Sequence, residues 1–295
     1  MLQMEIMSVA LLFSSINQLR RKVYRITMQS SSSEYEKRAQ SRQRLAYGKG
    51  RWQYGELYLP KSTGPHPVVI LVHGGYWRKA YDLTLMHPLA KNLAQHGYAV
   101  WNIEYRRVGN TGGAWPGTFL DVAQATDYIY EIASTYQLDT QRVIAVGHSA
   151  GGHLAGWLAT RPQLSKESPL ATATSPLHLS AVVSLAGVVD LVQAYQLHLS
   201  HDAVVELLGD TPAAVPERYA AASPAAHLPL GIPQIVVHGT ADKHVPLIVS
   251  QNYARKAHAA GDQITYLEVP EADHFTIIDP NTDAWRQTLA AIQMR

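Results

Sequence analysis

Short apolar runs and longer amphipathic stretches alternate along the chain from residue 51 onward. The segment 52–59 alternates polar and apolar residues and ends at Pro60, which predicts an early antiparallel strand. Continuous apolar runs follow, and such runs are typical of parallel strands that are covered on both faces. These runs lie at 68–72, 99–103 and 143–146, and further strands are predicted at 181–185, 234–238 and 264–269.

Amphipathic stretches between these runs predict helices. The helices are expected at 83–96, at 119–136, from 149 on, at 245–260 and at 283–294. Strands and helices that alternate in this way build crossover units around one sheet. The sequence therefore predicts an α/β fold with a mostly parallel central sheet and helices on both faces.

Two stretches interrupt the alternation, 163–179 and 188–230. The second is rich in Ala and Pro, lies between two predicted strands and is too short for a convincing second domain. We interpret 188–230 as a small cap or lid over the carboxyl edge of the sheet, where open α/β sheets bind ligands. A plain surface loop with one helix is the alternative.

Composition narrows the class of protein. The 295 residues are 46% hydrophobic and 16% charged, which excludes a disordered chain. A net charge of +2 is too balanced for a protein that works by neutralising phosphates, so we expect no nucleic-acid partner. The absence of Cys from the sequence excludes disulfides, thiolate metal sites and a Cys nucleophile.

The first 28 residues are interpreted separately. An apolar run at 6–16 follows Glu5 and precedes a basic cluster, which is the reverse of a secretory signal. The run is also shorter than the ~18 residues that a membrane span needs. We expect residues 1–28 to be an N-terminal extension that is either disordered or upstream of the true start, with Met28 as a candidate initiation site, and a weak interfacial helix is the alternative. The α/β domain would then be 29–295, and we expect it to be cytoplasmic and without stable membrane insertion.

A nucleophile is predicted at Ser149. The sequence Gly-His-Ser-Ala-Gly at 147–151 directly follows the apolar run 143–146 and opens a helix, as a nucleophile elbow requires. The glycines allow strand and helix to approach closely, and the Ala150 N–H would point to where an oxyanion forms. A Ser N-cap between flexible glycines is the alternative.

The loop His-Gly-Gly-Tyr-Trp at 73–77 follows strand 68–72 and suits the other half of an oxyanion hole. Backbone N–H groups in such a turn stabilise the charge that develops on a carbonyl oxygen, and we expect Gly75 or Tyr76 to donate. His73 is expected to hold the shape of the loop. Tyr76 and Trp77, with Trp115, are candidates for an aromatic substrate wall, although they can equally be core residues.

A hydroxyl nucleophile needs a base, and a base needs an acid that orients it. Asp242 follows strand 234–238 and His274 follows strand 264–269, so both lie on loops at the carboxyl edge. The order Ser, Asp, His is the one that this type of sheet uses. Asp190, after an earlier strand, is the alternative acid.

We expect structural roles for the other acidic and histidine residues near the site. Two carboxylates beside the base, Asp273 and Asp279, are expected to cap or solvate their loop. Packing or loop-pinning roles are expected for His148, His153, His238 and His244. His148 is in addition a candidate for the substrate wall because it adjoins Ser149. No metal and no cofactor are expected.

The motifs at 73–77, 147–153 and 273–275 resemble those of the α/β-hydrolase superfamily, and within it kynurenine formamidase. The resemblance covers about residues 52–294 and implies hydrolysis of N-formylkynurenine to formate and kynurenine, with Ser149, Asp242 and His274 as the triad. The motif at 147–153 is also shared with small carboxylesterases and acetylated-sugar esterases, so a small-ester carboxylesterase is the second hypothesis. A non-catalytic binding scaffold is the third, and the complete triad argues against it. A small molecule is the expected substrate, and a homodimer is left open.

Overall fold

The computed structural model describes residues 42–294. The prediction for residues 1–28 therefore lies outside the described residues. No helix within the described range is long and apolar enough to cross a membrane.

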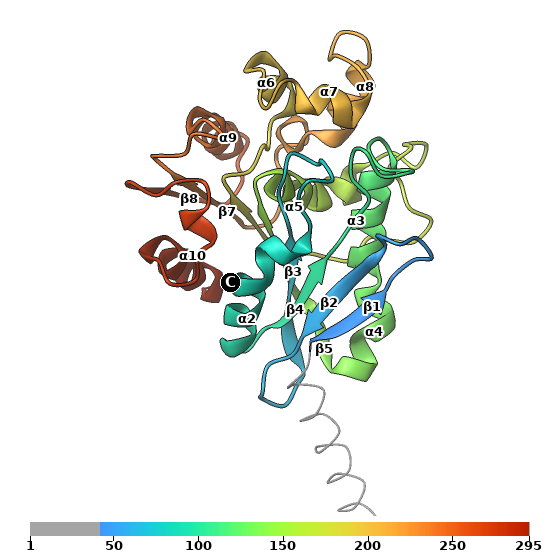
Figure 1. Cartoon of the computed structure of the whole chain (residues 1–295), viewed down its shortest axis with the longest axis vertical. Coiled ribbons are helices and arrows are strands. Elements are labelled where there is room, and N and C mark those ends of the chain that lie inside the picture. Colours follow the sequence, from blue (N-terminus) through green and yellow to red (C-terminus); the bar gives the residue numbers. More distant parts are fainter. Residues whose placement is uncertain (1–41, 295) are drawn as a thin grey trace, which may run out of the picture. The chain divides into compact units, whose positions relative to one another are not determined.

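Eight strands of the described range form one sheet in the order β1-β2-β4-β3-β5-β6-β7-β8 (Figure 1). The strands are β1 (Gln43–Ala46), β2 (Tyr54–Tyr58), β3 (His66–Val72), β4 (Ala99–Ile103), β5 (Leu138–His148), β6 (Ala181–Leu185), β7 (Gln234–Gly239) and β8 (Ile264–Val269). The pairs β1–β2 and β2–β4 are antiparallel, and every later pair is parallel. The sheet and its neighbouring helices are those of the predicted α/β-hydrolase fold.

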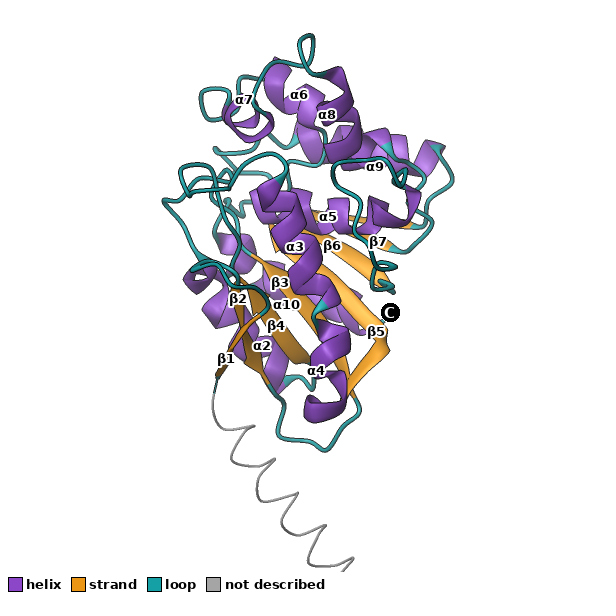
Figure 2. Ribbon diagram, turned by 90° about the vertical axis from the view of Figure 1, so that its right-hand side faces the viewer, coloured by secondary structure: helices purple, strands orange, loops and turns teal. Residues whose placement is uncertain are grey.

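Helices cover both faces of this sheet (Figure 2). One face carries α2 (His87–Gln95) and α10 (Asp283–Gln293), whose apolar side chains share one core with alternate residues of the central strands. The other face carries α3 (Gly117–Asp127), α4 (Ile129–Tyr136), α5 (Ala150–Thr160) and α9 (Ile248–Ala259). The central strands are buried on both sides, which explains their continuous apolar sequences.

Two predicted helices differ from the observed ones. The segment 83–96 is a 3-10 turn, η1 (Leu83–Met86), followed by α2, because Pro88 lacks an N–H and suits only the first turn of a helix. The segment 119–136 is interrupted at Tyr128. There the Thr126 hydroxyl donates to Val122 O and the Trp101 indole donates to Ala125 O. These bonds compete for carbonyls of the helical ladder and favour a bend.

The segment 188–230 contains three short helices, α6 (Leu191–Gln196), α7 (Ala203–Leu208) and α8 (Pro216–Ala222), and the turn η3 (Pro224–Ala226). Figure 1 shows α6, α7 and α8 grouped together at one end of the fold. The segment leaves the sheet at the carboxyl end of β6 and returns at the start of β7. We call 188–230 the cap, and its function as a lid stays a prediction.

Candidate active site

Ser149 occupies a sharp turn between β5 and α5. Its backbone has φ 56° and ψ −121°, a conformation that L-residues rarely adopt. The glycines on either side permit the turn, since a Cβ on Gly147 would lie 1.9 Å from Gly151 O. Ser149 is buried, and its Oγ has no hydrogen-bond partner in the described part of the chain. This geometry matches the predicted elbow and leaves the hydroxyl free for another group.

An acid and a base meet at the carboxyl ends of β7 and β8. His274 Nδ1 lies 2.6 Å from Asp242 Oδ2 and donates to it. The other carboxylate oxygen, Asp242 Oδ1, accepts from the amides of His244 and Val245 at 2.7 and 2.9 Å. The carboxylate is thus fixed by its own loop, and it fixes the tautomer in which His274 Nε2 is a free acceptor.

Asp242 is held as a carboxylate. Burial alone would raise its pKa, but hydrogen bonds from His238 and His274 lower the pKa of Asp242 well below its usual range. His238 Nε2 lies 3.3 Å from Asp242 Oδ2, and its ring also bonds Ser250 Oγ and Val245 O. His238 therefore pins the acid loop, as the sequence predicts for this histidine, and in addition contacts the acid itself.

His148 joins the nucleophile to the base. Its Nε2 donates to the backbone oxygen of His274 at 2.8 Å, and the two rings are 4.5 Å apart. Burial lowers the pKa of His148 to about 3, with the nearby His274 charge acting in the same direction. A neutral His148 places no positive charge beside the base. Because it is buried, this residue positions His274, and contact with substrate stays only a prediction.

The second half of the oxyanion hole follows β3. Gly75 and Tyr76 both have positive φ, 112° and 48°, and their amides donate to no group within residues 42–294. The loop lies against the nucleophile, since a Cβ on Gly74 would be 2.9 Å from Ser149 Cβ. The amides of Gly75, Tyr76 and Ala150 remain the predicted oxyanion donors.

His73 holds this loop, as predicted. Its Nδ1 donates to Gly74 O at 2.8 Å, and its Nε2 lies 3.1 Å from the buried carboxylate of Glu104. Tyr105 stacks on the imidazole at 4.4 Å and donates its hydroxyl hydrogen to His73 O. The buried guanidinium of Arg107 lies 3.4 Å from Glu104. The loop therefore rests on a packed polar cluster.

The three aromatic candidates lie in different surroundings. Tyr76 donates its hydroxyl hydrogen to His244 O at 2.6 Å and so links the oxyanion loop to the acid loop. Burial, with the Asp242 charge, raises the pKa of Tyr76 to about 12. Trp77 is only 1% exposed and donates from its indole to His153 Nδ1 at 3.1 Å. Trp115 is half-buried and its amide donates to Leu207 O in the cap. The structure thus favours a loop-holding role for Trp77 over a substrate wall.

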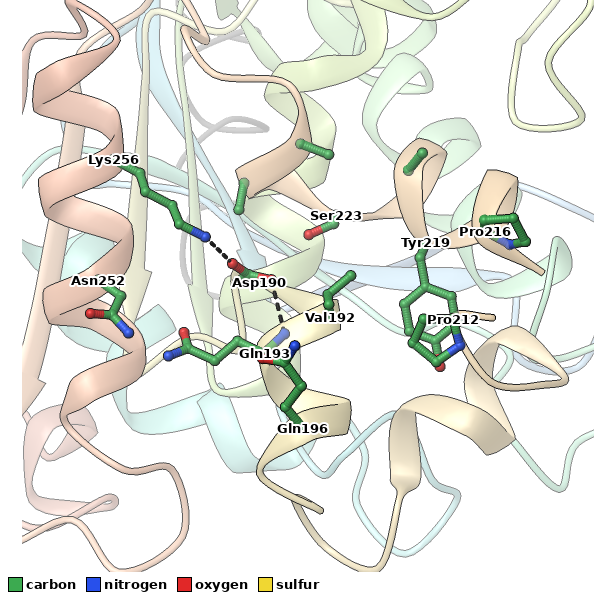
Figure 3. Close-up of a pocket in the computed structure, with 13 residues that line it drawn as sticks. Asp190, Val192, Gln193, Gln196, Pro212, Pro216, Tyr219, Ser223, Asn252 and Lys256 are labelled. Carbon is green, nitrogen blue, oxygen red and sulfur yellow. Dashed lines mark hydrogen bonds and ion pairs between the residues drawn. The ribbon is translucent and has the colours of Figure 1, made fainter. Parts of the chain in front are cut away.

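Asp190, the alternative acid, is bonded to groups other than a histidine. Asp190 caps α6 by accepting from Gln193 N at 3.0 Å and pairs with Lys256 Nζ at 2.7 Å (Figure 3). It lines a separate cavity of about 550 Å³ between cap helices and α9. Asp273 accepts from Phe275 N and from Thr276, and Asp279 accepts from Asn281, so both order their own loop as predicted.

Sequence reasoning missed one residue beside His274. Phe275 is 39% exposed, and its ring meets the rings of His274 and His244 at 5.3 and 5.5 Å. The Phe275 ring therefore presents an exposed apolar surface directly beside His274. Its position directly after His274 is the signal that could have found it. Within residues 42–294, no three His, Asp or Glu side chains are placed to hold a metal ion.

Known proteins share this arrangement of elements. The BD-FAE family model matches residues 56–257. Esterase LipC of Mycobacterium tuberculosis is 29% identical over 252 residues, which are 81% of this chain and 60% of that protein. Kynurenine formamidase of Drosophila melanogaster is 29% identical over 170 residues, which are 57% of this chain and 52% of that protein. The chain spans 50 to 60% of the length of the first three esterases that it matches.

A solved structure shows the same fold. The native esterase Est2 of Thermogutta terrifontis superposes with a TM-score of 0.70 at 24% identity, over 86% of this chain and 90% of that one.

Proposed function

The chain belongs to the BD-FAE family, and we propose that it is a serine hydrolase that releases a small acyl group from an ester or an aryl amide. The observation that carries this proposal is the 2.6 Å bond between His274 and Asp242, together with the contact that joins His274 to the elbow through His148. A nucleophile, a base and an orienting acid are the minimum that such chemistry needs.

Attack on the substrate begins at Ser149. Its Oγ bonds to the carbonyl carbon while its proton moves to His274 Nε2, and the carbonyl π electrons move onto oxygen. The amides of Ala150 and of Gly75 or Tyr76 stabilise this oxyanion more than the ground-state carbonyl. Asp242 stabilises the imidazolium that forms, because its own proton is already lost.

The intermediate then collapses. The bond from the carbonyl carbon to the leaving oxygen or nitrogen breaks, and His274 gives its proton to that atom. Water, deprotonated by the same base, attacks the acyl-serine, and the acid is released with Ser149 restored. The leaving group departs beside His274, where Phe275 and His244 present their rings.

Aryl formamides are the first substrate class. This choice rests on the motif at 73–77 and on the similarity to kynurenine formamidases of fly and zebrafish, the latter 24% identical over 76% of that protein. Small carboxylic esters are the second class, supported by the similarity to LipC and to LipM, a probable carboxylic ester hydrolase.

Acyl size separates the two classes. We compare kcat/KM for N-formylkynurenine, p-nitrophenyl acetate and p-nitrophenyl butyrate, with Ser149→Ala as control. In a pocket shaped for formyl, each added methylene-sized group costs about 10- to 200-fold. We therefore expect the formamide to be cleaved fastest and the butyrate slowest.

Two results would change this proposal. Fast cleavage of the butyrate with no cleavage of the formamide would assign the carboxylesterase activity. Failure of a fluorophosphonate probe to label wild-type protein at Ser149 would exclude a serine hydrolase of either kind.

A further inference from the structure

The oxyanion loop, which we define as residues 73–79, is strained at its centre. Tyr76 and Trp77 have φ of 48° and 57°, in the left-handed region that side chains with a Cβ avoid. Such conformations persist only where surrounding contacts hold them. The contacts that hold this pair therefore also determine where the oxyanion donors lie.

Arg78, directly after the strained pair, binds the cap. Its Nε and one terminal nitrogen donate to the two carboxylate oxygens of Glu206 on α7, at 2.7 and 2.8 Å. The terminal nitrogens also donate to Ser200 Oγ and Ser200 O, both at 2.9 Å. The planar guanidinium is thus fixed in a fork by two cap residues that lie more than 120 positions later in the chain.

The backbone of the same residue closes the turn that carries the donors. Arg78 N donates to Gly75 O at 3.0 Å, so Gly75 opens a hydrogen-bonded turn in which Tyr76 and Trp77 are the central residues. On the other side, Val108 N donates to Trp77 O at 2.8 Å and anchors the loop to the body of the protein. A displacement of Arg78 is transmitted to the amides of Gly75 and Tyr76 because only one turn separates them.

The cap side of this contact is itself unusual. Ser200, His201 and Asp202 all have φ between 50° and 57°, directly before α7. Two strained segments therefore face each other across Arg78. An isolated surface ion pair needs no such arrangement, and the exposed fractions of Arg78 and Glu206, 30% and 45%, would make the charge attraction alone weak.

We propose that Arg78 is a positioning residue that docks the oxyanion loop onto the cap and so keeps the oxyanion donors in place. The cap then contributes to turnover through this contact. This inference rests on the proposed hydrolase activity, since it assigns the amides of Gly75 and Tyr76 to a transition state.

The test uses full-length Arg78→Gln, Arg78→Lys, Glu206→Gln and the double variant Arg78→Gln/Glu206→Gln. Arg142→Gln is the matched control, because it removes another exposed arginine from an ion pair with Asp139. We measure kcat and KM with p-nitrophenyl acetate, inhibition by a trifluoromethyl ketone that mimics the tetrahedral intermediate, and Tm.

Misplaced oxyanion donors should lower kcat about 10- to 100-fold in Arg78→Gln and in Glu206→Gln, with KM changed less than about threefold. The Ki of the ketone should rise in parallel with the loss of kcat/KM, because both report binding of the oxyanion. The double variant should be no worse than either single one, since both remove the same contact. Arg78→Lys should lie between wild type and Arg78→Gln, because an ammonium cannot form the fork.

A lowered Tm with kcat within twofold of wild type would overturn the proposal, because it would show a purely structural ion pair. A change in KM alone would overturn it as well. If Arg78→Gln does not fold, Glu206→Gln decides by the same readouts. Wild-type protein that is neither labelled by fluorophosphonate nor active on any substrate would instead remove the proposed function, and the inference with it.

Discussion

Asp190 and Asp242 follow adjacent parallel strands of one sheet, yet only Asp242 meets a histidine ring. Asp190 is engaged by Lys256 and by the N-terminus of α6. Triad members act as a unit, and loss of the nucleophile or base lowers kcat by about 10⁶ whereas loss of the acid lowers it less. We expect this order for Ser149→Ala, His274→Ala and Asp242→Asn, with kcat for Asp190→Asn within about threefold of wild type. Full activity of Asp242→Asn in steady-state assays would contradict the assignment.

We expect Phe275 to contact an aryl leaving group and Trp77 to hold the oxyanion loop. Phe275→Leu should lower kcat/KM for phenyl acetate by about three- to tenfold and leave methyl acetate almost unchanged, because only the aryl leaving group stacks on the ring. Trp77→Phe should lower both equally, because it removes the indole bond to His153 and loosens the loop. Tyr130→Leu, which removes an exposed tyrosine on α4, is the control. Equal effects of Phe275→Leu on the two esters would exclude an aryl contact.

Helices and strands were predictable to different degrees. The strands β4, β6 and β8 begin and end where the sequence predicts. For β4 and β6 the reason is that buried parallel strands have mostly apolar sequences, whereas β8 is a partly exposed strand at the edge of the sheet. β1 has an alternating pattern of only four residues and was not predicted, and β5 begins at Leu138, earlier than predicted. The first half of β5 contains exposed polar residues, so no hydrophobic pattern identifies it as a strand. The interruption at Tyr128 was missed because a side chain of another element contributes to it, as Trp101 does at Ala125, whereas Pro88 is a signal within the segment 83–96 itself.

The site was predictable where chemistry and order along the chain restrict the choice. Ser149, Asp242 and His274 each follow a strand, which predicts that they converge, and the contact between His274 and Asp242 is the part of this prediction that the structure shows. The contacts that support them could not. Tyr76 bonds to His244 and Arg78 bonds to Glu206 across more than 120 residues, and no local pattern links either pair.

The free energy of unfolding of the protein should be lower in mild acid than at neutral pH. Burial lowers the pKa of His153 to about 4, from its ordinary value of 6.5. Between pH 6.5 and 4 the His153 side chain binds a proton in the unfolded chain but not in the folded one. As the pH falls through this range, the free energy of unfolding therefore falls by about 1.4 kcal/mol per pH unit for this group. Protonation of His153 would also place a hydrogen on its Nδ1, where it would face the Trp77 indole N–H and break the hydrogen bond between the two rings.

His153→Gln should therefore lower Tm at pH 7.5 but reduce the further drop in Tm between pH 7.5 and 5. The glutamine retains a donor for Ala222 O and cannot titrate in this range. Calorimetry at the two pH values measures the difference. His258→Gln, at an exposed site on α9, should leave the drop unchanged. An equal drop in wild type and His153→Gln would assign the acid sensitivity to other groups.

The order of the site along the chain also governs when activity can first arise during synthesis. Ser149 and its elbow are translated first, and the base arrives 125 residues later at the loop after β8. Translation of that interval takes on the order of 10 s. Throughout it the nascent chain carries Ser149 without His274, so the proposed acyl transfer cannot begin. The position of His274 beyond β8 therefore delays the proposed activity until every strand of the sheet has left the ribosome.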